Sequence, residues 1–128
     1  MKGKDFIIVG AISGALAVLI GAFGSHWLRD MMTAEEMNSF QTASKYHFIH
    51  SLALLFAGYY GNRKQSSKSL AVASYLFISG ILLFCTSLYA TRVFPTWWMA
   101  SVPPLGGLSF VGGWISIAID AAISRVKG

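Results

Sequence analysis

The sequence predicts an all-α membrane protein, a single domain of residues 1–128 built as a bundle of four transmembrane helices. Its mean hydropathy is +0.58, and hydrophobic residues make up 55% of it against 12% charged. Four apolar stretches each approach the roughly 20 residues that cross a bilayer as a helix. Because the bilayer offers no water to pair backbone groups, each span must form its hydrogen bonds internally as a helix.

The predicted spans are about 6–25, 43–60, 70–90 and 105–123, and the basic residues between them are distributed unevenly. The face that both termini share with the middle loop carries seven basic residues: Lys2, Lys4, Arg63, Lys64, Lys68, Arg125 and Lys127. The other face carries three: Arg29, Lys45 and Arg92. The positive-inside rule then predicts a multi-pass plasma or inner membrane protein with both termini in the cytoplasm. Since these charges lie in short loops, we interpret them as topology signals and expect no nucleic acid partner.

The first span carries a stripe of small residues on one helix face. Its glycines are Gly10, Gly14, Gly21 and Gly24. Small side chains let another helix approach closely, which is a main source of contact between helices in lipid. We therefore expect this face to pack against another helix. The span ends at His26.

The second span is preceded by a helix start. Thr33 followed by Glu36 is the capping-box pattern. The polar residues 34–45 are expected in or above the headgroups, so that the chain enters the bilayer at about residue 43. Tyr46 and His50 share one face with Ala43, Ala53 and Ala57 by the helical period, and His50 is therefore expected to point toward the packed side.

The last two spans have a polar outer end and a second small-residue stripe. Cys85 is the single cysteine and is expected to pack as a small apolar residue. Pro103 and Pro104 are typical of a first helical turn and predict that the fourth span begins there. Gly106 and Gly113 belong to its packing stripe. Asp120, near the cytoplasmic end, is expected to be neutralised by Arg125 or Lys127.

Polar residues of the four spans are predicted to converge near the outer leaflet. The candidate cluster consists of His26, Tyr46, His50, Ser87 and Tyr89. Polar groups at such depth cost free energy unless they are paired, and ionisable residues inside membranes are functional candidates by default. The cluster could be an internal hydrogen-bond network, or it could hold a lipid headgroup or a partner helix.

Three histidines, His26, His47 and His50, are candidate metal ligands, and His26 with His50 could ligate a haem. No cysteine or carboxylate lies beside them in the sequence to complete a metal site. We therefore expect no cofactor. No nucleophile is accompanied by both a base and an orienting acid, so no catalytic residue is predicted.

Four blocks together resemble the YgdD/YwdK-like family of small membrane proteins of unknown function, which also has a related eukaryotic transmembrane group. They are Gly21-Ala22-Phe23-Gly24-Ser25-His26, Tyr46-His47-Phe48-Ile49-His50-Ser51-Leu52-Ala53, Thr86-Ser87-Leu88-Tyr89, and Pro104-Leu105-Gly106-Gly107 leading to Gly113-Trp114. The family pattern has alanine at the place of Ser25 and glutamine at that of His47. His26, Tyr46 and His50 therefore match the family motif, whereas His47 departs from it. The resemblance implies a membrane location and no agreed activity.

Three functions remain open from the sequence. The first is a non-enzymatic membrane protein that supports envelope integrity and holds a membrane lipid or a partner at the polar cluster. The second is a histidine-based metal or haem binder. The third is a component of a transporter or channel that self-associates through the stripe of Gly10, Gly14 and Gly21.

Overall fold

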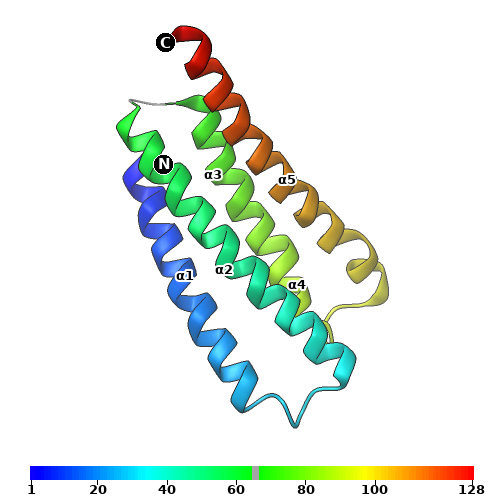
Figure 1. The fold of residues 1–128 in the computed structure, drawn as a ribbon. Coiled ribbons are helices and arrows are strands. Elements are labelled where there is room, and N and C mark those ends of the chain that lie inside the picture. Colours follow the sequence, from blue (N-terminus) through cyan, green and yellow to red (C-terminus); the bar gives the residue numbers. More distant parts are fainter. Residues whose placement is uncertain (65–66) are drawn as a thin grey trace.

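The computed structural model describes residues 1–64 and 67–128, and every regular element in this part of the chain is helical. The helices are α1 (Gly3–His26), α2 (Ala34–Arg63), α3 (Lys68–Gly80), a π-helical segment η1 (Ile81–Cys85), α4 (Thr86–Tyr89) and α5 (Thr96–Lys127). Because α3, η1 and α4 follow each other without a break, they form one rod, and the bundle has four rods (Figure 1). The all-α prediction is confirmed.

Three of the rods are long and apolar enough to cross a membrane: Gly3–His26, Lys68–Tyr89 and Thr96–Lys127. The predicted spans 6–25, 70–90 and 105–123 lie on these rods. The predicted span 43–60 lies on α2, which is 30 residues long but more polar than the other three. Its polar side chains His47, His50 and Ser51 are buried inside the bundle.

The helix α2 occupies the centre of the arrangement. It packs along α1 on one side and against α3, η1 and α4 on the other, while α5 packs mainly against α3 and η1 (Figure 1). Both ends of the chain lie at the end of the bundle where α2 connects to α3. The central position explains the composition of α2, because a helix surrounded by other helices can carry polar groups that pair inside the protein.

The two predicted glycine stripes lie at helix contacts within the chain. A Cβ added to Gly10 would meet Leu55 at 3.0 Å, and one added to Gly24 would overlap the ring of Phe40 at 2.0 Å. Gly14 faces Ser51 and Gly21 faces Ser44, both on α2. In α5, Gly106 faces Phe84 and Gly113 faces Phe77 of the third rod. The stripe of α1 is therefore covered by α2 and is not a free surface for self-association.

Two expectations about helix ends have different outcomes. Thr33 caps α2 as predicted: its hydroxyl accepts the Glu36 N–H at 3.1 Å, and the Glu36 carboxylate accepts the Thr33 N–H at 3.0 Å. The predicted helix start at Pro103 and Pro104 is wrong, because α5 begins at Thr96 and both prolines lie inside it. They are the eighth and ninth residues of α5, so each removes one hydrogen bond from the helix ladder, a loss that neighbouring helices and side chains can offset in a membrane helix.

The expectation that Arg125 or Lys127 neutralises Asp120 is also wrong. The carboxylate of Asp120 pairs with the Lys64 ammonium at 2.7 Å and accepts the hydroxyl of Ser67. Arg125 and Lys127 lie beyond Asp120 on the same helix, in an exposed last turn. Lys64 comes from the end of α2, which the bundle brings beside α5, so this ion pair ties two rods together.

Candidate functional site

The polar side chains of the bundle interior form two separate groups around the buried histidines of α2. His47 and His50 are both buried, although they are three residues apart and point to different neighbours. His47 faces α1 and α4, whereas His50 faces α5. The His47 group is built from residues of α1, α2 and α4, whereas the His50 group joins α2 to α5.

The His47 group is a directed chain of hydrogen bonds. The Ser51 hydroxyl donates to the His47 carbonyl at 2.7 Å, so its oxygen accepts the hydroxyl hydrogen of Ser13, also at 2.7 Å. Ser13 then has no hydrogen left and accepts one from His47 Nε2 at 3.0 Å. His47 Nδ1 is consequently the acceptor for the Tyr89 hydroxyl at 3.0 Å. In the neutral imidazole this places the hydrogen of His47 on Nε2.

The His50 group has the opposite arrangement of donor and acceptor. His50 Nδ1 lies 2.7 Å from the carbonyl of Tyr46, which only accepts, so Nδ1 carries the hydrogen. Its Nε2 accepts the indole N–H of Trp114 at 3.1 Å, and its ring stacks on Phe110 with 3.6 Å between ring centroids. Both ring nitrogens are therefore used by protein groups, which leaves no lone pair for a metal or haem iron.

The structure does not bring His26 to either group. His26 is exposed at the end of α1, thirteen residues beyond Ser13, or about 20 Å along the helix. Among the described residues no set of three or more His, Cys, Asp and Glu side chains is arranged to hold a metal ion. The candidate metal set His26, His47 and His50 is thus spread over different depths and faces.

Ser87 and Tyr46 lie apart from the His47 chain. The Ser87 hydroxyl donates to the Leu83 carbonyl at 2.6 Å and accepts the Trp98 indole N–H at 3.0 Å. Tyr46 is partly exposed, with its ring against Phe84. Of the five predicted cluster residues, Tyr46 and His50 meet directly, and Tyr89 instead joins His47.

The predicted depth of the cluster needs correction as well. We expected residues 34–45 in or above the headgroups; in the structure Phe40 packs on Gly24 and Ser44 on Gly21, so this part of α2 runs beside the last turns of α1. His47 consequently lies level with Ser13, near the middle of α1. The polar groups therefore extend from the end of α4 at Tyr89 to the middle of the bundle and do not gather at one end.

Sequence reasoning missed Ser13, Trp98 and Trp114, which supply partners for the other polar side chains. Ser13 was detectable in principle, because a serine in the middle of an apolar span needs a partner. The indole of Trp114 was not, since its pairing with His50 depends on how α5 crosses α2.

A groove of about 380 Å³ lies over the His47 chain, between α1 and the third rod. Its α1 wall runs from Val9 to Ile20, and its other wall runs from Ile78 to Tyr89. Apolar side chains such as Leu16 and Leu82 make up most of these walls. Part of the second wall is the π-helical segment, and such segments often occur at functional sites.

Three of the four polar side chains that line the groove are paired within the protein, and the fourth, Thr86, is an exposed residue. Ser13, His47 and Tyr89 line it, and each is engaged in the hydrogen-bond chain described above. Across the described residues no buried side-chain nitrogen or oxygen is left without a partner. An occupant of this groove therefore needs no hydrogen-bonding group of its own, and a plain hydrocarbon chain matches its lining.

The comparisons with known proteins identify the family. A family model described as "Protein of unknown function (DUF423)" matches residues 20–107, more than half of the chain. The chain belongs to this family. The match covers the whole of α2, the whole third rod and the start of α5, and it includes His47, His50 and Tyr89.

Two bacterial relatives resemble the chain over nearly its whole length. The UPF0382 membrane protein YwdK of Bacillus subtilis is 36% identical over 118 residues, which cover 92% of this chain and 96% of the relative. The UPF0382 inner membrane protein YgdD of Escherichia coli K12 is 35% identical over 128 residues, covering 100% of this chain and 97% of the relative. No solved structure was found to match. The predicted resemblance to the YgdD/YwdK-like family is confirmed.

Proposed function

We propose that the chain is a non-enzymatic protein of the cytoplasmic membrane that crosses the bilayer four times, with both termini in the cytoplasm. It contributes to the integrity of that membrane by holding the acyl chain of a phospholipid in the groove between α1 and the third rod. The observation that carries the proposal is the groove itself, which is walled by apolar side chains and has a polar floor whose groups are already paired.

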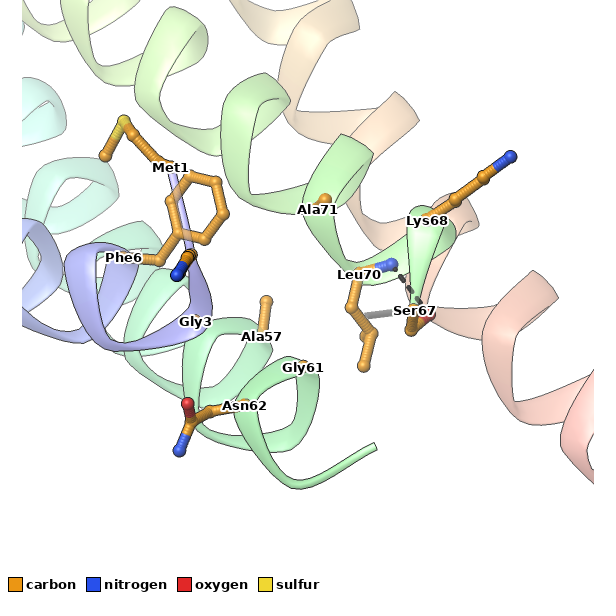
Figure 2. A pocket seen from close by; sticks show the side chains of 11 residues that line it. Met1, Gly3, Phe6, Ala57, Gly61, Asn62, Ser67, Lys68, Leu70 and Ala71 are labelled. Atoms are coloured by element: carbon orange, nitrogen blue, oxygen red, sulfur yellow. Dashed lines mark hydrogen bonds between the residues drawn. The ribbon is translucent and has the colours of Figure 1, made fainter. Parts of the chain in front are cut away.

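The membrane crossing of α2 is supported by its packing on α1. Gly3 meets Asn62 at one end of the pair (Figure 2), and Gly24 meets Phe40 at the other, so the two helices run side by side over the length of α1 (Figure 1). Since α1 has the length and hydropathy of a span, α2 is proposed to cross with it. The seven-to-three distribution of basic residues supports the cytoplasmic location of both termini.

The dimensions of the groove suit an acyl chain of the outer leaflet. From Val9 to Ile20 the α1 wall extends over eleven residue steps, or about 16 Å. This length is about half of the roughly 30 Å hydrocarbon thickness. Because Tyr89 ends α4 at the proposed outer side, a chain that enters beside Tyr89 would pass Ile20 and reach the level of Ser13 near the middle of α1, and the groove continues from there to Val9.

Photocrosslinking tests the proposal. The full chain is reconstituted with a phospholipid that carries a diazirine on one acyl chain, and crosslinked peptides are mapped by mass spectrometry. We expect crosslinks to concentrate on groove residues such as Leu16 and Leu82, compared with Leu108, which is 66% exposed on α5 and outside the groove. Thr86→Phe should fill the groove and reduce these crosslinks, whereas Leu108→Phe should not. Crosslinks spread evenly over the apolar faces would refute the groove.

A further inference from the structure

A second hollow, of about 330 Å³, lies between α1 and α2 and contains a lysine at an unusual depth. Lys45 lines it together with Gln41, Ser44 and Ser25. Two phenylalanine rings, Phe40 and Phe48, complete its walls. The hollow thus combines one cationic and three neutral polar side chains with aromatic surface.

Lys45 lies inside the length of the bundle and not in a loop. Its neighbour Ser44 packs on Gly21, which precedes the last residue of α1 by five positions, or about 8 Å. In the proposed topology this level is just below the outer boundary of the hydrocarbon. A charged group there is costly unless it reaches the interface or finds an opposite charge.

No carboxylate of the described residues pairs with Lys45. The ion pairs in this part of the chain are Lys64 with Asp120 and Arg92 with Glu36. Glu35, in the first turn of α2, is ten residues from Lys45, or about 15 Å along the helix. The charge of Lys45 is therefore available to a ligand.

We infer that the hollow beside Lys45 binds a phosphate group, namely that of an anionic phospholipid in the outer leaflet. The lysine ammonium supplies the charge, and the Gln41 amide, a hydrogen-bond donor, lines the same hollow with Ser44. The rings of Phe40 and Phe48 would contact the glycerol and the first methylenes. This site is on the opposite side of the α1–α2 pair from the acyl-chain groove, and it rests on the proposed topology only for its depth.

Thermal stabilisation of the purified full chain in detergent tests this site with three probes: phosphatidylglycerol, a diacylglycerol with the same chains, and inorganic phosphate. We expect phosphatidylglycerol to raise the melting temperature and diacylglycerol to have little effect. In Lys45→Gln the apparent affinity for phosphatidylglycerol should fall about fivefold, the effect of one basic residue near a membrane surface. Lys45→Arg should keep most of the affinity, and Lys4→Gln, at the other end of the bundle, should behave as wild type.

The outcomes separate the sources of the phosphate. Stabilisation by inorganic phosphate that is lost in Lys45→Gln would support the phosphate site and replace the lipid by the free anion. Equal responses of wild type and Lys45→Gln to phosphatidylglycerol would overturn the inference. Neither result depends on the acyl-chain groove, whose lining excludes Lys45.

Discussion

At the scale of single residues, the glycines of α5 show how closely its helix approaches the third rod. A Cβ on Gly106 would lie 2.6 Å from the backbone nitrogen of Phe84, inside the π-helical segment, so no side-chain rotation could relieve the clash. On its neighbour Gly107 a Cβ would meet no described atom within 4 Å. Gly106 thus permits a close contact between helices, whereas the adjacent Gly107 faces open space.

We expect Gly106→Ala to destabilise the protein by about 1–3 kcal/mol, the usual cost of overpacking. Gly107→Ala should be neutral or stabilising by up to about 1 kcal/mol, because alanine loses less backbone freedom in a helix. Melting temperatures in one detergent compare the two variants. If both variants melted alike, the close contact between α5 and η1 would be contradicted.

The residue scale also shows where sequence reasoning succeeded and failed. The helical period correctly placed His50 on the packed side of α2, because burial on a helix face follows spacing. It gave His47 a lesser role than the structure does, since the partners Ser13 and Tyr89 lie 34 and 42 residues away. The direction of each hydrogen bond could not be predicted before these partners were in place.

At the scale of elements, each predicted span lies on a helix, but the ends of the helices differ from the predicted ends. Residues 34–45 at the start of α2 were expected in or above the headgroups, and in the structure they continue the contact with α1 through Phe40 and Gly24. Likewise Pro103 and Pro104 lie within α5. Local patterns report helix formation well, but the depth of a helix depends on its neighbours. The π-helical turn at Ile81–Cys85 had no sequence signal that we recognise.

An ion pair between Arg92, which follows α4, and Glu36 in the first turn of α2 should make the stability of the fold depend on pH. Arg92, after α4, donates to both carboxylate oxygens of Glu36 in α2, at 3.0 and 2.6 Å. The hydrogen bond from Arg92, followed by that from the Thr33 N–H, lowers the pKa of Glu36 below its ordinary value. A carboxylate with a lowered pKa stabilises the fold above the ordinary pKa and loses this contribution as pH falls through the lowered one.

We therefore expect Glu36→Gln to melt below wild type at neutral pH, because glutamine can still accept the Thr33 N–H but lacks the charge for Arg92. The difference should shrink as the pH falls below about 4.5, the ordinary value for this carboxyl, and vanish in stronger acid. Melting curves between pH 7 and pH 3 measure it. Glu35→Gln, at an adjacent exposed position, serves as the control, and a difference that persists in strong acid would show that the ion pair is not its cause.

At the scale of the whole molecule, the arrangement reconciles a polar helix with a membrane location. The three apolar rods carry most of the surface that faces lipid, while α2 holds the buried histidines between them. The groove and the Lys45 hollow both arise beside α2, on opposite sides of its contact with α1. Both proposed lipid contacts therefore require that α2 crosses the bilayer next to α1.

Cysteine accessibility tests this crossing most directly. In a Cys85→Ser background, single cysteines replace Asp30, Asn62, Val93 and Val126, which lie at the two ends of the bundle. A membrane-impermeant maleimide is added to spheroplasts of a bacterial host before and after permeabilisation. The four-span account predicts that positions 30 and 93 react at once and that positions 62 and 126 react only after permeabilisation. Equal reaction at positions 30 and 62 in sealed spheroplasts would contradict it.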